Sequence, residues 1–427
     1  MLAAVSTPSF RPSPQATAVS RDRGDACPGA LRLHTADDGA LARIRIPGGV
    51  LSVGQAQVLG RAAQELGDGE LHLTSRGNVQ VRGLEPGSGG ELAERLGAAG
   101  LLPSWRHERV RNIVASPLSG LDGRGFTDVR PWLRELDRLL CASEVTAGLS
   151  GRFLFALDDG RGDVAGLGAD VSLRAVPGGG ALLRLGTSAS VVPLHAEDAP
   201  RAALVAAELF LATAGDGAWR MSELGERTAE LVSATVHRLR APRPTTAPAW
   251  HPTAEPVPGS VTAPDGTTSL SVLAPLGRLT AAQWTELTTS ARHELRLTPW
   301  RGVILPASPA SRLPDLAAAG LITDPASAWT GIGACIGRPG CGRSHADVRA
   351  DAATALGPAG GLPVYWSGCE RRCGRPHGDH VDVVAEQDGG YRVSAVRDGH
   401  ARADTTHTHH HPSALAAAVA AARTHTQ

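Results

Sequence analysis

A strand–helix–strand pattern that occurs twice constrains the fold of this chain more than any other feature. Each copy of the helix begins at a capping box, a Ser or Thr followed three residues later by Gln. The first box is Ser52 and Gln55, and the second is Thr280 and Gln283. Leucine and alanine follow the first box at helical spacing, so we expect an amphipathic helix in each copy.

The strands around the two helices repeat as well. Apolar residues alternate with arginines over residues 42–46, and a similar alternation occurs over 270–274. A Glu-Leu-x-Leu-Thr motif follows the helix at 70–74 and returns about 224 residues later at 294–298. Alternation of this kind is typical of half-buried strands. The sequence therefore predicts two copies of one βαβ unit.

The second halves of the copies are also alike. Residues 109–117 lie about 219 residues before the similar segment 328–335, and residues 167–171 resemble 377–381. Seven prolines in residues 241–264 indicate an extended linker between the copies. We expect a duplicated α/β (α+β) architecture around a pseudo-twofold axis, with its site at the seam. The predicted parts are a flexible leader (1–25), a half repeat (26–100), an α/β unit without a cysteine cluster (101–240), the linker (241–264), a second half repeat (265–320), an α/β unit with four cysteines (321–400) and a His-rich tail (401–427).

Composition excludes several classes of function. The 42 basic residues balance 42 acidic ones, which argues against binding to nucleic acid or an acidic membrane by bulk charge. All 42 are arginine, so chemistry that needs an amine, such as a Schiff base, is excluded. The sequence contains no apolar run of roughly 18 residues, which predicts no membrane span. Residues 1–25 lack the basic and continuous apolar regions of a signal peptide, so we expect a cytoplasmic protein. Its six cysteines are too few for a disulfide scaffold.

Four cysteines form the strongest chemical signal. Cys335 and Cys341 are separated by five residues, and Cys369 and Cys373 by three. Four thiolates in two close pairs can hold an iron-sulfur cube or a tetrahedral zinc ion, and unligated thiols are the third alternative. The glycine-rich gaps are longer than the two-residue gaps of zinc knuckles, so we favour the iron-sulfur cluster. Cys27 and Cys141 stand alone, as is typical of plain small side chains, while the histidines at 407–411 predict an adventitious metal-binding tail.

Together with the cysteines, two further motifs carry a family resemblance. Thr74, Arg76 and Gln80 form a T-x-R-x-x-x-Q segment, and residues 111–117 read R-N-I-x-x-x-P. With the cysteine spacing, these motifs resemble the sirohaem sulfite and nitrite reductase superfamily. The resemblance implies ferredoxin-like half repeats and a 4Fe-4S cluster held by the four cysteines. In the reductases the last cysteine, here Cys373, also bridges to the sirohaem iron.

One departure from the reductases points to a particular branch. The reductases use a lysine pair to protonate the bound anion, and this chain has Arg152 and Leu154 at the similar positions. Arginine is a poor proton donor and leucine donates nothing. Residues 26–32 and 151–160 instead resemble the precorrin-3B synthase branch. That resemblance implies hydroxylation of precorrin-3A at C20 with lactone formation, using the 4Fe-4S cluster, dioxygen and electrons from a separate reductase. The chain itself shows no dinucleotide-binding fingerprint.

The resemblance also implies candidate site residues. A mononuclear non-haem iron would need imidazole and carboxylate ligands, for which His377, Asp379 and His380 are candidates, with His107 and His345 as further ones. Two alternatives stay open: a sirohaem-dependent sulfite or nitrite reductase, and a non-catalytic tetrapyrrole-binding scaffold stabilised by zinc or a cluster. The predicted site comprises Arg111 and Arg152 as catalytic residues, Arg76, Gln80 and Asn112 as substrate-binding residues, and Cys335, Cys341, Cys369 and Cys373 as metal ligands.

Overall fold

The computed structural model describes most of the chain. The described residues are 25, 27–215, 217–248, 253, 255–376, 378–397, 400–401, 406–408 and 412–424. Apart from Asp25, the predicted leader lies outside them, as do His377 and His409–His411 of the tail. Among the described residues, the structure contains no helix that is both long and apolar enough to cross a membrane.

Two antiparallel sheets built from the half repeats form the centre of the molecule, and each contains a strand from the other copy. The first sheet has the order β1-β2-β5-β4-β14, and the second has the order β12-β13-β16-β15-β3. Strand β14 of the second copy pairs with β4, and β3 of the first copy pairs with β15. The strands are β1 (His34–Ala36), β2 (Gly39–Ile44), β3 (Val50–Ser52), β4 (Leu71–Leu73), β5 (Val79–Leu84), β12 (Gly259–Thr262), β13 (Thr268–Leu273), β14 (Arg278–Leu279), β15 (Glu294–Leu297) and β16 (Gly302–Leu305).

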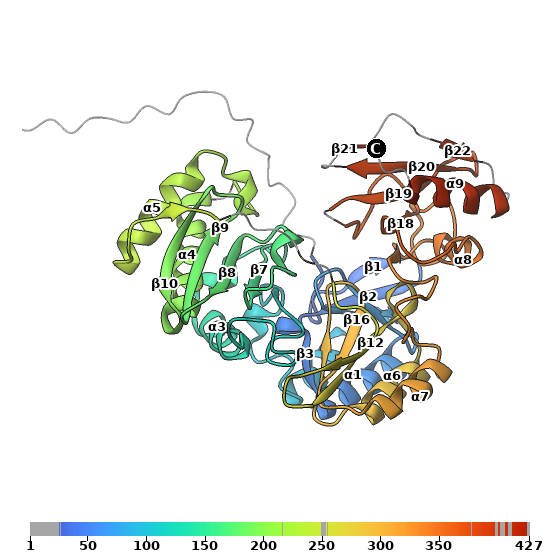
Figure 1. Ribbon diagram of the computed structural model, residues 1–427, viewed down its shortest axis with the longest axis horizontal. Coiled ribbons are helices and arrows are strands. Elements are labelled where there is room, and N and C mark those ends of the chain that lie inside the picture. The colour runs from blue at the N-terminus through green and yellow to red at the C-terminus, as the bar shows by residue number, and fades with distance from the viewer. Residues whose placement is uncertain are drawn as a thin grey trace, which may run out of the picture.

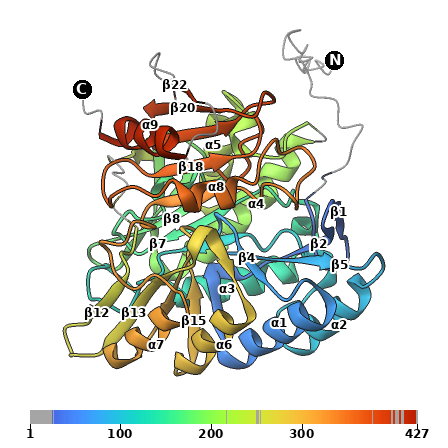
Figure 2. The ribbon, with the colours of Figure 1, turned by 90° about the vertical axis from the view of Figure 1, so that its right-hand side faces the viewer.

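Helices cover one face of the two central sheets (Figure 2). They are α1 (Val53–Leu66), α2 (Gly89–Ala98), α6 (Ala281–Ser290) and α7 (Leu313–Ala318). Both predicted capping boxes are confirmed, because Ser52 and Thr280 each exchange hydrogen bonds with the Gln three residues on. Helices α1 and α6 pack so closely that the Trp284 indole donates to the Ala56 carbonyl at 2.7 Å. The half repeats therefore share one hydrophobic core.

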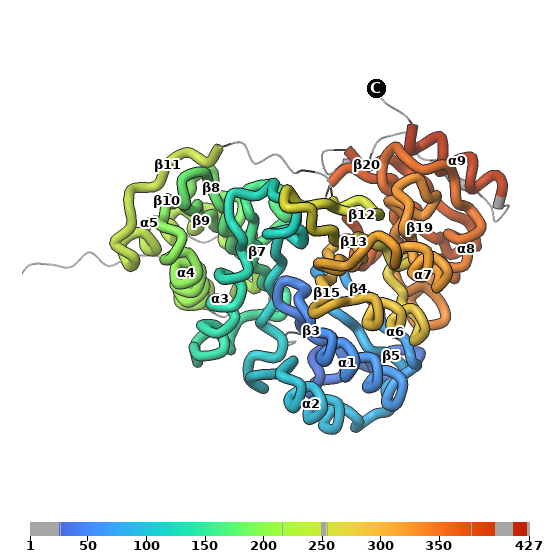
Figure 3. Tube along the Cα trace, turned by 60° about the horizontal axis from the view of Figure 1, so that its bottom comes forward, coloured from blue at the N-terminus to red at the C-terminus, as the bar shows by residue number. Residues whose placement is uncertain are grey.

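Two outer α/β units flank this centre (Figures 1 and 3). The first contains β6 (Ile113–Ala115), β7 (Phe155–Asp158), β8 (Val171–Val176), β9 (Gly180–Leu185), β10 (Ser190–His195), β11 (Thr245–Thr246), α3 (Arg130–Ala142), α4 (Ala199–Ala214) and α5 (Arg227–Leu239). The second contains β17 (Ile332–Ala334), β18 (Val364–Ser367), β19 (His380–Ala385), β20 (Tyr391–Arg397), β21 (His400–Ala401), β22 (Thr406–Thr408), α8 (Val348–Thr354) and α9 (Pro412–Thr424). In both units three parallel strands are followed by antiparallel ones. The duplicated α/β architecture predicted from the sequence is confirmed.

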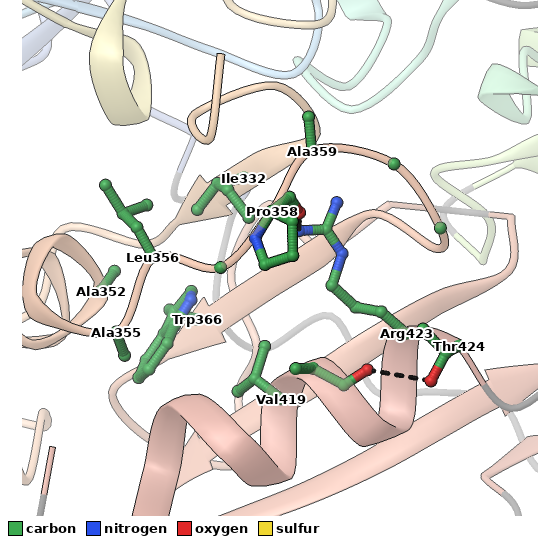
Figure 4. Close-up of a pocket in the computed structure, with 14 residues that line it drawn as sticks. Ile332, Ala352, Ala355, Leu356, Pro358, Ala359, Trp366, Val419, Arg423 and Thr424 are labelled. Carbon is green, nitrogen blue, oxygen red and sulfur yellow. Dashed lines mark hydrogen bonds between the residues drawn. The ribbon is translucent and has the colours of Figure 1, made fainter. Parts of the chain in front are cut away.

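The C-terminal helix α9 closes a small cavity of about 140 Å³ against the second unit (Figure 4). Leu415 and Val419 of this helix are buried in the core of the unit. Arg423 donates to the carbonyls of Leu362 and Pro358 at 3.0 and 3.1 Å, and it is the one charged residue among those lining the cavity. Most of the residues that line the cavity are therefore apolar, and none is a carboxylate, histidine or cysteine.

Candidate functional site

The cysteines lie on two loops at one edge of the second unit. Cys335 directly follows β17, and Cys369 comes two residues after the end of β18. Because β17 and β18 run parallel, their carboxyl ends meet at the same edge of the sheet. The backbone joins the two loops, since the N–H of Cys335 donates to the Trp366 carbonyl at 2.9 Å and the N–H of Gly368 donates to Cys335 Sγ at 3.2 Å.

The four sulfurs are close enough to influence one another. Burial raises the pKa of Cys335, and the charges of Cys373 and Cys341 raise it further, against two backbone N–H donors that lower it. Burial likewise raises the pKa of Cys373, as do Cys369 and Cys341. A metal or cluster that binds these sulfurs would have to displace their protons, because thiols bind metal as thiolates.

The spacing of the sulfurs fits a cluster better than zinc. Tetrahedral zinc at about 2.3 Å from each sulfur would hold the sulfurs about 3.8 Å apart. Within the described residues, no three cysteine sulfurs all lie within 4.8 Å of one another. Four thiol side chains on two loops at one edge of the sheet are the kind of donor set that a 4Fe-4S cluster takes.

The first cysteine loop is held in place by the other copy. Gly342 N–H donates to Asp37 at 2.5 Å, and Arg82 on β5 donates to the Gly340 carbonyl at 2.8 Å. The Arg82 guanidinium is in turn fixed by Asp38 at 2.7 Å. The first half repeat thus supports the cysteine loop of the second unit, and the spacing of the cysteines gave no signal for this.

The first unit has no cysteines at the equivalent positions. Aligning the paired strands β6 and β17 places Ser116 at the position of Cys335 and Asp122 at that of Cys341. Aligning β7 with β18 places Gly160 at the position of Cys369.

An ion network occupies this region of the first unit. The Arg161 guanidinium pairs with Asp122 and Asp159 at 2.8 Å and lies 3.9 Å from Asp163, while Ser116 donates to Asp163 at 2.7 Å. Burial raises the pKa of Asp163 to about 7. One copy therefore keeps four thiols at this edge of its sheet, and the other keeps a buried arginine among carboxylates.

The predicted substrate residue Arg76 lies in the turn between β4 and β5, among other arginines. Burial lowers the pKa of Arg76 to about 10, and the positive charges of Arg220, Arg45 and Arg43 lower it further. Within the described residues the Arg76 side chain makes no hydrogen bond or ion pair. Asp170 is the carboxylate with the largest effect on Arg76, and it is already paired with Arg220 at 2.7 Å. We call Arg43, Arg45, Arg76 and Arg220 the arginine group.

Gln80 lies at the edge of the arginine group. With its amide turned so that the oxygen faces Arg43, Gln80 accepts from Arg43 Nε at 3.2 Å and from Nη2 at 2.7 Å. Arg45 is buried and donates to Cys27 Sγ at 2.9 Å and to the Gly151 carbonyl at 3.2 Å. The alternation of Arg43 and Arg45 with apolar residues placed them on one strand face, but we did not select them from the sequence. Arg220 gave no sequence signal.

Arg152 and Leu154 differ in how far their side chains are exposed. Arg152 is exposed, and its guanidinium stacks over Trp219 at 4.5 Å from the ring centroid. Leu154 is 1% exposed and packs against Val114 and Ala156. The position similar to the second reductase lysine is therefore part of a hydrophobic core.

Comparisons with known proteins agree with this architecture. Residues 34–99 and 262–320 match the nitrite/sulfite reductase ferredoxin-like half domain. The chain is 30% identical over 392 residues to a ferredoxin–nitrite reductase of Synechococcus elongatus, covering 79% of this chain and 74% of that protein. The chain belongs to the nitrite/sulfite reductase family. The superfamily resemblance predicted from the motifs is confirmed.

Two other matches extend the comparison. A precorrin-3B synthase of a Sinorhizobium species is 28% identical over 407 residues, covering 90% of this chain and 85% of that protein. The solved structure of the Mycobacterium tuberculosis NirA protein superposes with a TM-score of 0.70 at 21% identity, covering 88% of this chain and 79% of that one. The structural likeness shows that the reductase fold is shared.

In this nitrite/sulfite reductase family member, Arg111 and Asn112 are held by other side chains and by backbone carbonyls. Arg111 is 4% exposed and donates to both oxygens of Asp137 at 2.7 Å and to the Leu101 carbonyl at 2.9 Å. Asn112 is fully buried, accepts from Asn78 at 2.9 Å and donates to the Phe153 carbonyl at 3.0 Å. These contacts join the first half repeat to the first unit; the catalytic role predicted for Arg111 and the substrate-binding role predicted for Asn112 stay predictions.

Among the described residues, no three of the candidate ligands for a mononuclear iron come together. His377 lies outside the described residues, Asp379 pairs with Arg397 at 3.3 Å, and His380 is buried in β19. Both nitrogens of His107 are engaged, by Ser104 and by the Ser143 carbonyl. His345 is partly buried and forms no three-ligand group among the described residues.

One other trio of ligand-type residues occurs in the described part of the chain. Ligand atoms of Asp68, Glu70 and His72 lie within 4.8 Å of one another. However, a guanidinium can only donate, so Arg349 donates to His72 Nδ1 from 3.2 Å, and Arg278 pairs with both oxygens of Glu70. When one ring nitrogen of an imidazole binds a metal, the other carries a hydrogen and donates it to an acceptor. The trio therefore does not fit a metal ion.

Proposed function

We propose that this protein is a precorrin-3B synthase, an iron-sulfur monooxygenase that hydroxylates precorrin-3A at C20 and forms a lactone. The arginine group carries this proposal, because Arg76 lies among three other guanidinium groups and makes no hydrogen bond or ion pair within the described residues. Such an excess of positive charge needs a ligand with several carboxylates, and arginine's planar fork pairs with carboxylates bidentately. Precorrin-3A is a macrocycle with carboxylate side chains.

Each part of the site has a role in the proposed reaction. One oxygen atom of dioxygen enters at C20 and the other leaves as water, using two electrons and two protons; an acetate side chain then closes the lactone. Cys335, Cys341, Cys369 and Cys373 would hold the 4Fe-4S cluster, which supplies electron transfer when bound. Arg76 and Arg152 would bind substrate carboxylates, and Gln80 would orient Arg43. The electrons would come from a separate reductase, and the reaction would take place in the cytoplasm.

Two observations favour this reaction over reduction of an inorganic anion. Leu154 is buried and cannot deliver a proton, and the exposed Arg152 is a poor proton donor. The similarity to a precorrin-3B synthase also extends over 85% of that relative. A hydroxylation at carbon loses nothing when arginines replace lysines, because the arginines are needed only to bind.

The deciding experiment uses labelled dioxygen. The full chain is reconstituted with iron and sulfide without air, then mixed with precorrin-3A, a reductase system and ¹⁸O-labelled dioxygen. We expect one labelled oxygen atom in the product by mass spectrometry and none when labelled water replaces labelled dioxygen. A product without label from dioxygen would contradict the monooxygenase. Iron in excess of sulfide in the active protein would indicate a mononuclear iron beside the cluster.

A sirohaem-dependent nitrite or sulfite reductase is the second candidate, favoured by the 30% identity with a ferredoxin–nitrite reductase. In that case Cys373 would bridge to sirohaem, and the purified protein would show strong Soret and long-wavelength bands. A broad shoulder near roughly 400 nm alone is expected of a cluster without sirohaem. A non-catalytic scaffold, the third reading, would bind precorrin-3A without consuming dioxygen, or would contain zinc and no iron.

A further inference from the structure

We infer that Arg349 is a positioning residue that balances the charge of the cluster and raises its reduction potential. The inference rests on the 4Fe-4S cluster of the proposed function. Arg349 lies in the first turn of α8, directly after the first cysteine loop, and its Nε donates to the Cys335 carbonyl at 3.2 Å. The guanidinium therefore lies against the backbone of a predicted cluster ligand.

Hydrogen bonds hold Arg349 in place as a fixed positive charge. An arginine guanidinium stays protonated in proteins, so the charge is present at neutral pH. No carboxylate of the described residues forms an ion pair with Arg349. Its charge is thus available to the thiolates.

His72 holds the other end of this guanidinium. His72 is 5% exposed, and its Nδ1 must accept the 3.2 Å hydrogen bond from Arg349. In the neutral ring the proton then lies on Nε2, which faces Asp68 at 3.8 Å and Glu70 at 3.9 Å. The trio that does not fit a metal ion thus fits as a support for Arg349.

A second arginine approaches the other cysteine pair in a similar way. The Arg301 guanidinium lies 5.3 Å from the centroid of the Tyr365 ring and donates to the Gly374 carbonyl at 3.3 Å. The Tyr365 hydroxyl donates to the Cys373 carbonyl at 2.6 Å. In each cysteine loop, an arginine therefore donates to a backbone carbonyl at or next to a predicted ligand.

The effect on the cluster follows from its charge. A cube with four thiolates carries net negative charge and gains one more negative charge on reduction. A partly desolvated cation nearby stabilises the reduced form more than the oxidised form, because the Coulomb energy grows with the charge of the cluster. Removing the cation should make reduction harder.

The test is a redox titration of the reconstituted full chain, followed by the electron paramagnetic resonance signal of the reduced cluster. We expect Arg349→Gln to lower the equilibrium constant for reduction at least about tenfold, equal to a shift of about 59 mV to more negative potential. Arg349→Lys keeps the charge and should stay close to the wild type. Arg343→Gln removes an exposed charge near the same loop, and screening should limit its effect to about twofold.

The outcomes separate this inference from the proposed function. If the wild type takes up the cluster but Arg349→Gln has the same reduction potential, the role of Arg349 alone is overturned. Equal shifts in Arg349→Gln and Arg343→Gln would overturn it as well. Wild-type protein that takes up no iron and sulfide would overturn the cluster and this inference together. The potential belongs to each loaded cluster, so a variant with lowered iron content still gives a valid reading.

Discussion

Replacing Arg161 by methionine should strongly destabilise the protein. Arg161 is the cation of the ion network in the first unit, where its side chain is 12% exposed. It donates to both oxygens of Asp122 and of Asp159, whose side chains are 6% and 0% exposed. Methionine has a similar length and no charge, so the variant leaves two buried carboxylates without their cation.

The structure sets the size of the effect. A hydrogen bond to a charged group contributes about 1.5–3 kcal/mol, and two carboxylates lose such contacts. Removing one partner of a buried ion pair typically costs about 3–5 kcal/mol. The two routes agree, so we expect a loss of about 3–5 kcal/mol in the free energy of unfolding. The loss should be smaller at about pH 5 than at about pH 8, because the stranded carboxylates can take up protons.

Urea unfolding followed by circular dichroism measures this loss. Arg138→Met is the matched control, because Arg138 pairs with Glu135 on the exposed side of α3. That variant should unfold at the same urea concentration as the wild type. A loss below about 1 kcal/mol in Arg161→Met, the scale of a surface pair, would refute the reasoning.

Three further predictions concern single side chains. Burial raises the folded-state pKa of Asp163 from 3.8 to about 7, so the wild type should lose stability as the pH rises through this window. Asp163→Asn should make stability less dependent on pH. If the melting temperatures of the wild type and the variant change equally between about pH 5 and pH 8, this prediction is wrong. Arg76→Gln should weaken precorrin-3A binding at least about tenfold in an absorbance titration, while the exposed Arg106→Gln should bind normally; equal affinities would remove Arg76 from the site. Cys373→Ser should lose cluster iron and sulfide and Cys141→Ser should keep both, so a fully loaded Cys373→Ser protein would disprove that ligand assignment.

Local features of this fold could be predicted from the sequence. Both capping boxes form as expected, because a Ser or Thr side chain reaches the backbone three residues on without help from the rest of the fold. The repeat at fixed spacing predicted the duplication, since similar patterns bury similar faces. The two cysteine pairs could also be recognised in the sequence, because the residues of each pair are close enough in the chain to lie on one loop.

Long-range partners could not be predicted in this way. Arg111 matched a motif, yet it pairs with Asp137 on α3, a contact that no spacing rule encodes. Arg220 joins the arginine group only because the first unit folds back against the turn that carries Arg76. The same limit applies to Arg349, which meets His72 from the other copy.

The sequence by itself determined the two repeated units, their capped helices and the four clustered thiols, because each depends on residues close together in the chain. Only the tertiary structure decided that β3 and β14 exchange between the copies and that the first half repeat supports a cysteine loop. It also decided that, within the described residues, Arg220 pairs with Asp170 while Arg76 forms no ion pair. Ion pairs and strand pairings between distant residues depend on the packing of the whole chain, and local spacing carries no information about them.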